Sequence, residues 1–579
     1  MATYLGISEG HFDPAVAIVR DGVLLAFVEE ERLLRYKHAP GLYPVRALKW
    51  ALDEAGVKLD EIDAVAVPWD IDAFGDGRIA DFYAGLAARH DQGEATRRWQ
   101  ATKLRDFSAD ATEGRHHQVW RRYFGISAPP PIRGVAHHYA HVVQAGLQSP
   151  YEESIVLTID GSGDTECTVI WLRRGSELEQ LHQITMPDSL GWFYAAITEF
   201  LGFHAYGEEY KVMGLAAYGT ARPDLNERVS RMLSRTDGRP EYRLDPAYIH
   251  NGRHSTSGRF TDQLTELFGR DPRQPDAPMT QWHMDLAYTA QRSLEDTVCR
   301  LVGWAIEKTG VINVSLGGGV AHNVKLSLAL SDRTRAERVF AHPLCGDSGA
   351  AAGAALALSR ADGYDPEPLT TVALGPHWSD EEVERELGRF GCRYRIPADL
   401  PGEVAGALAD GAVVGWAQGR LEAGHRALGQ RSILADPRRV EARDRVNSAI
   451  KMRENWRPFC PAMPAGDAHR YLVGDSDYRF MTATCRATDA LSRLAPAVVH
   501  VDGTVRPQVV DRELQGLFHE LLTRFGERTG VPVLLNTSFN LAGEPIVSSV
   551  ADAVRTFWSS GLDLLVVGRC VVDKRDMAG

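Results

Sequence analysis

The sequence predicts an α/β protein that contains an internal duplication. Short apolar stretches joined by turns open the chain and indicate a meander of strands at residues 4–7, 15–19 and 24–28. The same pattern returns later in the chain, at residues 155–159 and 168–172. Ile7 and Asp160 end the first strand of each half, and they are separated by the same number of residues as the turn glycines Gly22 and Gly175. This matched spacing predicts two copies of one fold.

A helix and glycine-rich segments complete the pattern. Pro44 and Gly56 bracket a segment with apolar residues along one helical face, which predicts a helix after the first meander. Two tight turns that each follow a first strand can hold a phosphate chain through backbone N–H groups. Gly317–Gly319 lie between an apolar strand and a predicted helix, where a helix N-terminus suits an adenylate. This order of elements is that of the actin-like ATPase fold.

Two changes in composition divide the chain. Residues 70–130 are rich in charged and aromatic side chains and have no counterpart in the second copy. We expect a helical insertion there, which is either a solvated elaboration or a specificity element. Near residue 360 the sequence becomes polar and contains prolines, and an apolar strand follows. We therefore expect an actin-like domain over residues 1–362 and a second α/β domain over residues 368–579.

Composition limits the classes of partner. The 579 residues carry a formal net charge of -13, which argues against a nucleic-acid backbone as the partner. The seven cysteines show no CxxC spacing and their odd number fits poorly with a disulfide framework. No stretch approaches the ~20 apolar residues that span a bilayer, and the N-terminus lacks the pattern of a signal peptide. We expect a cytoplasmic protein with no nucleic-acid or membrane partner, either a monomer or a homodimer.

Two histidines and two aspartates are candidates for a metal site. His137 and His141 are four positions apart in a predicted helix, so both imidazoles can reach one ion. Asp160 follows a buried strand, and Asp347 precedes a small-residue helix. Such a set fits a divalent transition ion, for which we expect iron(II) ahead of zinc(II), although a mixed nitrogen and oxygen shell accepts either. The alternatives are histidines on a packed face, and aspartates that cap helices or contact nucleotide-bound magnesium.

Longer motifs make the sequence resemble a known family. In the first part they are HHYAH (137–141), YKVMGLAAYG (210–219), GGGVAHN (317–323) and GDSGAAAGAA (346–355). In the second part they are GWAQGRLEAGHRALGQRSILADPR (415–438), KMRENWRPFCPAM (451–463), VRPQVV (505–510) and LLNTSFNLAGEPIV (534–547). On these motifs, which span nearly the entire chain, the sequence resembles the NodU/CmcH-type O-carbamoyltransferases.

The resemblance implies a two-step reaction. It implies an actin-like N-terminal domain and a YrdC-like C-terminal domain. The second domain would condense ATP, with its magnesium, and carbamoyl phosphate to carbamoyl-adenylate, with release of pyrophosphate. The first domain would then pass the carbamoyl group to a hydroxyl of a natural product such as an antibiotic, a sugar or a macrolide.

The resemblance also implies roles for residues of the first domain. The metal ligands would be His137, His141, Asp160 and Asp347. His11 would be the base that takes the hydroxyl proton, and Lys37 would lie near the adenylate phosphate; the plain alternatives are a loop histidine and a surface lysine. Phe12 separates His11 from Asp13, whereas the family has His directly before Asp. The residues expected to bind carbamoyl-adenylate are Lys37, Gly161, Gly191, Lys211, Gly317, Gly318, Gly319 and Asn323.

The resemblance implies that ATP and carbamoyl phosphate would bring many negative oxygens together in the second domain, so several fixed cations would be needed. The residues expected to bind these substrates are Gly375, Arg426, Lys451, Arg457, Arg506 and Asn536. The family usually has a proline before the arginine that corresponds to Arg426, whereas this chain has His425 there. This departure bears on the expected shape of the loop more than on the expected function.

Two other functions use the same fold. An actin-like sugar kinase would use the phosphate loops with magnesium, and a nucleotide-gated binding protein would use them as a switch. Neither accounts for the histidine pair or for the basic motifs of the second domain. The fold alone does not decide among these functions, and no motif identifies the hydroxyl acceptor.

Overall fold

The structure is a computed structural model that describes residues 2–10, 13–90, 93–126, 128–236, 238–249, 258–454 and 456–577. The chain divides into two compact units. The first consists of Met1–Leu25 and Ala51–Pro368, and the second of Ala26–Trp50 and Leu369–Gly579. The later boundary lies beside the linker expected between residues 362 and 368. The change in composition predicts a single boundary in the chain. In the structure, however, the segment Ala26–Trp50 also belongs to the second unit.

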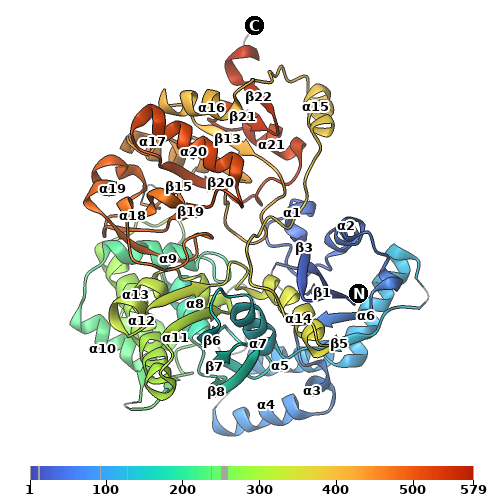
Figure 1. Cartoon of the computed structure of the whole chain (residues 1–579). Helices are drawn as coiled ribbons and strands as arrows, with labels where there is room; N and C mark the ends of the chain where they lie inside the picture. Colours follow the sequence, from blue (N-terminus) through green and yellow to red (C-terminus); the bar gives the residue numbers. More distant parts are fainter. Residues whose placement is uncertain are drawn as a thin grey trace. The chain divides into compact units, whose positions relative to one another are not determined.

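Two five-stranded sheets of the same topology form the first part of the fold (Figure 1). In the first sheet, β1 pairs antiparallel with β2 and parallel with β4. In the second, β6 pairs antiparallel with β7 and parallel with β11. The sheet orders are β3-β2-β1-β4-β5 and β8-β7-β6-β11-β12. The elements are β1 (Thr3–Ser8), β2 (Ala15–Arg20), β3 (Val23–Glu29), β4 (Ala64–Val67), β5 (Ile132–Gly134), β6 (Glu153–Ile159), β7 (Glu166–Arg174), β8 (Glu177–Thr185), β11 (Asn313–Gly317) and β12 (Arg338–Ala341). The shared order confirms the predicted duplicated, actin-like α/β fold.

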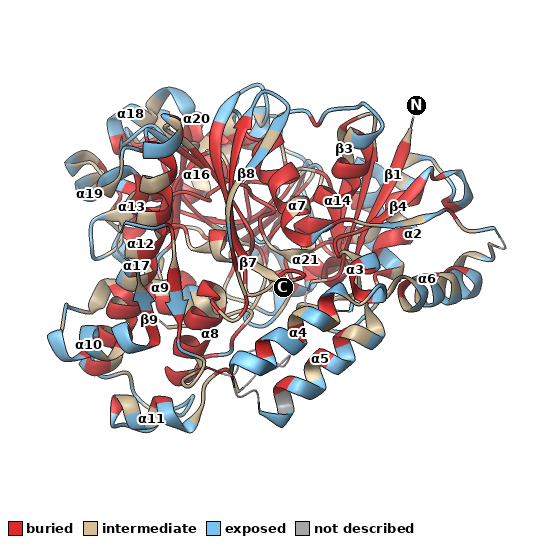
Figure 2. Cartoon of the chain, turned by 90° about the horizontal axis from the view of Figure 1, so that it is seen from below, coloured by how far each residue is buried: buried red, intermediate tan, exposed pale blue. Residues whose placement is uncertain are grey.

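Helices connect and cover these sheets. Those between β8 and β12 are α8 (Leu190–Phe200), α9 (Glu209–Leu215), α10 (Pro223–Met232), α11 (Asp262–Phe268), α12 (Gln281–Thr309) and α13 (Lys325–Arg333), with the small β9 (Leu233–Arg235) and β10 (Tyr242–Leu244) pair between α10 and α11. The segment predicted as a helical insertion contains α3 (Ile71–Gly75), α4 (Arg78–Arg89), α5 (Glu94–Asp106) and α6 (Ala109–Phe124). Figure 2 shows exposed residues along α4, α5 and α6, whereas β1, β4 and β7 are largely buried.

A helix of small residues, α14 (Asp347–Ala361), packs between the first sheet and α7 (His137–Val142). Its residues from Gly349 to Ser359 are buried. A Cβ atom at Gly353 would lie 2.2 Å from the carbonyl oxygen of Ala140 in α7. Glycine therefore permits the close approach of these two helices. The approach matters because α7 begins at His137 and α14 begins at Asp347.

We expect Gly353→Ala to destabilise the first unit by about 2–4 kcal/mol, because the added methyl group must push α14 away from α7. Thermal and denaturant unfolding would measure the change. Gly303→Ala is the matched control, since a Cβ there meets nothing within 4 Å in the middle of α12. That variant should be neutral or stabilised by up to about 1 kcal/mol. Equal stability of the two variants would contradict the packing argument.

His342 follows β12 and is fully buried. Its Nδ1 accepts the backbone N–H of Leu344 at 3.1 Å, so its Nε2 carries the proton and donates to Oε1 of Gln148 at 3.2 Å. Both nitrogens are thus used by the neutral ring. Burial, with the nearby His141, lowers the pKa of His342 to about 3. Protonation is therefore incompatible with the folded arrangement.

This lowered pKa predicts acid destabilisation. Above the unfolded pKa of about 6.5 the contribution of His342 to stability is complete, and it is lost as the pH falls toward the folded pKa. At about pH 5 the unfolded state gains roughly 2 kcal/mol from protonating this residue. Unfolding of the wild type and of His342→Gln at about pH 7.5 and 5 should therefore differ in pH dependence by that amount. Identical pH dependence would refute the assignment.

The second unit contains a seven-stranded mixed sheet of order β19-β15-β20-β14-β13-β21-β22. Its strands are β13 (Val414–Ala417), β14 (Arg431–Ala435), β15 (Cys460–Pro464), β19 (Gln508–Val510), β20 (Leu534–Ser538), β21 (Leu564–Val567) and β22 (Cys570–Asp573). Its helices include α15 (Asp380–Arg389), α16 (Leu400–Ala409), α17 (Val440–Arg445), α18 (Ala468–Tyr471), α19 (Asp489–Leu494), α20 (Gly516–Thr529) and α21 (Val550–Trp558). A small sheet is formed by β16 (Leu472–Val473), β17 (Cys485–Ala487) and β18 (Thr504–Val505). One apolar cluster joins the large sheet to α16 and α20, and another joins it to α15 and α21.

The segment Ala26–Trp50 belongs to this unit through polar contacts. It contains α1 (Glu30–Leu34) and the start of α2 (Val45–Ala55). Arg32 donates to the carbonyl of Gly424 at 2.7 Å, and Glu29 accepts the N–H of the same residue at 2.9 Å. Arg35 forms an ion pair with Asp552 at 3.2 Å. These side chains hold the N-terminal segment on the second unit.

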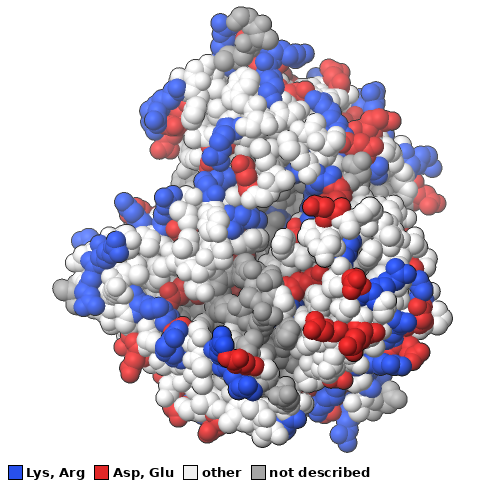
Figure 3. All heavy atoms as spheres, turned by 180° about the vertical axis from the view of Figure 1, so that it is seen from behind, with Lys and Arg blue, Asp and Glu red and all other residues white. Residues whose placement is uncertain are grey.

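Charged side chains of both signs lie on the surface. On the face drawn in Figure 3, Lys and Arg side chains are interspersed with Asp and Glu. Among the helices that the structure describes, none has the length and apolar character needed to cross a bilayer.

Candidate functional site

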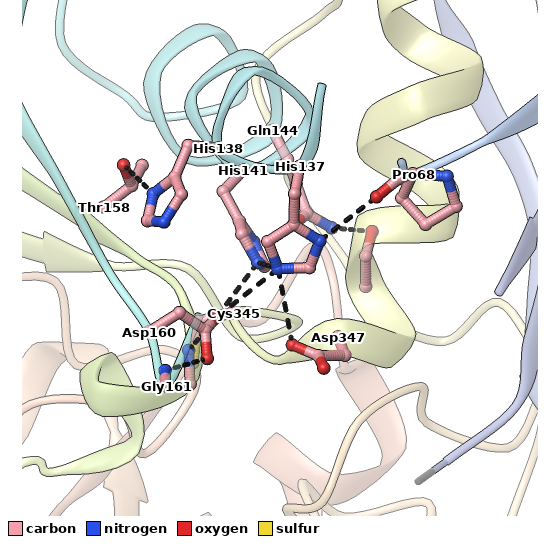
Figure 4. Close-up of polar contacts among 12 residues, drawn as sticks. Pro68, His137, His138, His141, Gln144, Thr158, Asp160, Gly161, Cys345 and Asp347 are labelled. Atoms are coloured by element: carbon pink, nitrogen blue, oxygen red, sulfur yellow. Dashed lines mark hydrogen bonds and ion pairs between the residues drawn. The ribbon is translucent and has the colours of Figure 1, made fainter. Parts of the chain in front are cut away.

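Four side chains converge in the first unit. Ligand atoms of His137, His141, Asp160 and Asp347 all lie within 4.8 Å of one another (Figure 4). His141 Nε2 is 3.2 Å from Asp160 Oδ2. His137 Nε2 is 3.7 Å from both Asp160 Oδ2 and Asp347 Oδ1. The structure therefore brings together the four residues that the sequence analysis grouped.

Element ends position this cluster. α7 begins at His137, and one turn later His141 points to the same side (Figure 4). Asp160 is the first residue after β6, and Asp347 is the first residue of α14. Because β6 and α7 are neighbouring elements and α14 packs on α7, the three ends meet.

Hydrogen bonds fix the orientation of the cluster. His137 Nδ1 donates to the carbonyl of Pro68 at 3.1 Å, which turns its Nε2 lone pair toward the carboxylates. Asp160 accepts the backbone N–H of Gly161 at 2.7 Å and of Gly319 at 2.9 Å. Asp164 accepts the N–H of His137 at 2.8 Å and so anchors the start of α7. The protein itself thus holds His137 and Asp160 in place.

The electrostatics of the cluster favour a cation. Although burial acts to lower it, hydrogen bonding to Asp160 and the charge of Asp347 raise the pKa of His137 to about 9. Removal from water and the charge of Asp160 raise the pKa of Asp347 to about 7, even though its side chain is 41% exposed. Two carboxylates held this close repel each other unless a positive charge lies between them. Two nitrogen and two oxygen donors in such an arrangement fit a divalent transition ion.

Glycines predicted to bind an adenylate border Asp160. A Cβ at Gly191, at the start of α8, would lie 2.7 Å from the nitrogen of Gly161. Gly318 has a φ of 82°, and a Cβ there would lie 2.2 Å from the carbonyl oxygen of Ile159. Gly317 and Gly319 flank it, at the end of β11. These backbone segments therefore surround the carboxylate of Asp160, where side chains larger than hydrogen would not fit.

Two other residues assigned to the adenylate have protein partners. Asn323 and Gln291 exchange amide hydrogen bonds at 2.8 and 3.0 Å. Lys211 forms an ion pair with Glu208 at 2.6 Å.

Lys451 is a buried cation of the second unit, and other cations lie near it. Its ammonium group is buried and donates to Ser538 and Asn540, including Asn540 Oδ1 at 2.7 Å. Burial and the charges of Arg453, Arg457 and Lys37 lower the pKa of Lys451 well below its usual value. Lys37 itself pairs with Glu31 at 3.2 Å. This crowding of positive charge is what a polyanionic ligand would relieve.

Three more of the residues assigned to the second unit lie around β20 and β15. Asn536 pairs with Cys460 across these strands and donates to Gln508 at 2.8 Å. Arg506 places its guanidinium fork on the sulfur of Cys460, at 2.9 and 3.1 Å. Arg426 precedes Ala427, whose carbonyl accepts from Asn536 at 3.4 Å. Arg426, Arg506 and Asn536 are therefore neighbours in the fold.

Two further assigned residues are placed by local contacts. Gly375 donates its backbone N–H to the carbonyl of Leu421 at 2.9 Å. Leu421 lies in the loop that precedes Arg426. Arg457 lies 3.6 Å from Glu454.

One assigned residue is not described, and other residues were missed. His11 lies outside the described residues, so its predicted role as the base stays a prediction. Sequence reasoning missed Asp164, whose signal was a second aspartate in the same glycine loop as Asp160. It also missed Trp69, whose ring stacks on His137 at 4.6 Å between centroids. No sequence pattern predicts that contact.

Comparison with known proteins identifies the family. The carbamoyltransferase N-terminus model matches residues 3–356, and the carbamoyltransferase C-terminus model matches residues 405–574. The chain belongs to the carbamoyltransferase family. It is therefore a carbamoyltransferase enzyme, and the predicted resemblance is confirmed.

Several relatives of this carbamoyltransferase cover much of its length. The nodulation protein NolNO of Sinorhizobium fredii is 37% identical over 97% of this chain and 79% of its own. The 3'-hydroxymethylcephem-O-carbamoyltransferase of Amycolatopsis lactamdurans is 29% identical over 62% of this chain and 63% of its own. Among solved structures, the Acidaminococcus fermentans (R)-2-hydroxyglutaryl-CoA dehydratase component A covers 62% of the carbamoyltransferase and 99% of its own chain, with 13% identity and a TM-score of 0.32.

Proposed function

We propose that this carbamoyltransferase is an ATP-dependent O-carbamoyltransferase that works in two steps. The second unit forms carbamoyl-adenylate from carbamoyl phosphate and ATP, and the first unit passes the carbamoyl group to a hydroxyl of a small molecule. The observation that carries the proposal is the convergence of His137, His141, Asp160 and Asp347 at the glycine loops of an actin-like fold.

The first step is supported by the cations of the second unit. Carbamoyl phosphate reacts with water to give carbamate and phosphate, and a carbamate oxygen then attacks the α-phosphorus of ATP and displaces pyrophosphate. Lys451 and the guanidinium fork of Arg506 would hold phosphate oxygens. Asn536 carries both a donor and an acceptor for the carbamoyl group. Its Oδ1 is buried and has no hydrogen-bond partner within the described part of the chain.

The second step is supported by the cluster of the first unit. The hydroxyl oxygen attacks the carbamoyl carbon, the bond from that carbon to the adenylate oxygen breaks, and the hydroxyl proton passes to a base, the role predicted for His11. A divalent metal, when bound, would polarise the carbonyl and offset the negative charge that develops on it. Asp160 and the two imidazoles would hold the ion, and Asp347 would complete the set. The glycine backbone around Asp160 would accommodate the adenylate.

Exchange of labelled pyrophosphate into ATP tests this function. The proposal predicts exchange that depends on carbamoyl phosphate, together with one equivalent of iron or zinc in the purified protein by elemental analysis. A sugar kinase or a nucleotide-gated binding protein would show no such dependence. Absence of exchange in folded, metal-loaded protein would overturn the proposal.

A further inference from the structure

The most buried residues described in α5 are polar. Thr96, Gln100 and Lys103 are 6%, 7% and 3% exposed and fall at helical spacing along one side. A helix that simply packs on a domain buries an apolar stripe. Burying polar groups costs free energy unless they meet polar partners. Lys103 is the charged residue on this face, and the groups around it therefore decide what its burial means.

Lys103 is the charged member of this face. Its Nζ lies 4.1 Å from the centroid of the Trp69 ring, 5.2 Å from that of Trp99 and 5.1 Å from that of Phe107. Aromatic faces attract a cation but offer no oxygen lone pair. Within the described ranges, Nζ forms no hydrogen bond and has no carboxylate within ion-pair distance. The N–H groups of the ammonium are therefore available to a ligand, and the three aromatic rings fix its position.

The position of Lys103 is beside the metal cluster. The indole of Trp69 that holds its ammonium also stacks on His137. The carboxylates of Asp164 and Asp347 both act on its charge. Burial nevertheless lowers the pKa of Lys103 to about 8, so that it remains protonated at neutral pH. Its neighbour Asp347 is the most exposed member of the cluster, which is the side that a substrate can reach.

We propose that Lys103 binds the hydroxyl acceptor, by donating a hydrogen bond to an acceptor oxygen beside the metal cluster. The inference rests on the proposed function. The acceptor is favoured over the carbamoyl donor because α5 belongs to the insertion, whereas the glycine loops assigned to the adenylate belong to the duplicated core. A fixed ammonium group also stabilises an oxygen that becomes negative as it loses its proton.

Cobalt(II) binding tests whether the charge of Lys103 faces the metal. Lys103→Met keeps the flexible apolar stem inside the aromatic cage but removes the charge. Because repulsion between the ammonium and the ion is lost, cobalt(II) should bind about tenfold more tightly, measured by competition with a chromophoric chelator. A purely structural defect would weaken binding instead. Lys308→Met is the matched control, since Lys308 is exposed and lies 4.9 Å from the Trp304 ring, and its affinity should be unchanged.

Azide on the cobalt(II) protein, followed by visible absorption, tests the binding role. Azide stands in for the negative acceptor oxygen, and its affinity should fall about tenfold in Lys103→Met and stay within about threefold of wild type in Lys103→Arg. If methionine lowers the melting temperature, Lys103→Gln repeats both measurements. Unchanged affinities for cobalt(II) or for azide would overturn the assignment. Failure of the wild type to bind cobalt(II) would instead overturn the metal centre of the proposed function, and the role of Lys103 with it.

Discussion

Asp160→Asn is expected to abolish tight metal binding and to lower carbamoyl transfer by about a thousandfold or more. Asp160 is the carboxylate of the cluster that lies close to both imidazoles, at 3.2 Å from His141 and 3.7 Å from His137. Asparagine has the same shape but no charge, and its single oxygen cannot accept from both Gly161 and Gly319. The ion would lose an anionic ligand, and the glycine loops would lose their common anchor.

Because the two proposed steps occur in different units, Asp160→Asn should affect only the second step. Exchange of pyrophosphate into ATP is assigned to the second unit, so Asp160→Asn should retain it while transfer is lost. Elemental analysis would measure the metal, and transfer would be followed with labelled carbamoyl phosphate. Asp285→Asn is a matched control, because Asp285 is also a buried carboxylate of the first unit and accepts from the N–H of Thr220 at 2.9 Å. Metal content equal to the wild type in Asp160→Asn would refute the cluster.

The duplicated fold and the convergence of the two histidines and two aspartates could be predicted because their signals are local. Alternation of apolar residues and tight turns marks each meander, and Asp160 stands directly after a strand. A pair of histidines four apart places both side chains on one face of α7 without any tertiary information. The position of Asp347 beside the histidines is not a local property, since it requires α14 to pack closely on α7 through Gly353 and Ala140. The run of small residues after Asp347 is the sequence signal for that close packing.

Other features could not be predicted because distant residues create them. Arg32 and Glu29 reach Gly424, which is remote in sequence, so no local pattern indicates that segment 26–50 joins the second unit. The sequence of α5, EATRRWQATKLRD, has the charge of a solvated helix, and only the fold shows that Lys103 is buried. Propensity and periodicity describe what a segment forms, whereas burial of a polar face depends on what the rest of the chain places against it.

Lys451→Met is expected to lower exchange of pyrophosphate into ATP by about a thousandfold, because it removes the buried cation of the second unit. The ammonium group is held by oxygens of Ser538 and Asn540 and so presents its charge in a fixed position. The charges of Arg453, Arg457 and Lys37 also act on this ammonium group. Such crowding destabilises the folded protein by itself, which is the pattern expected where a polyanion is the missing partner.

Loss of exchange must be separated from loss of fold. Methionine at position 451 leaves oxygens of Ser538 and Asn540 without their donor, which should cost roughly 1–3 kcal/mol of stability. Lys574→Met imposes a similar cost, because Lys574 donates to the carbonyls of Phe557 and Ser560 in the same unit. If both variants melt alike and only Lys451→Met loses exchange, the effect belongs to the ammonium charge. Equal exchange in the two variants would make Lys451 a structural residue, and the anion site would then depend on Arg506 and its neighbours.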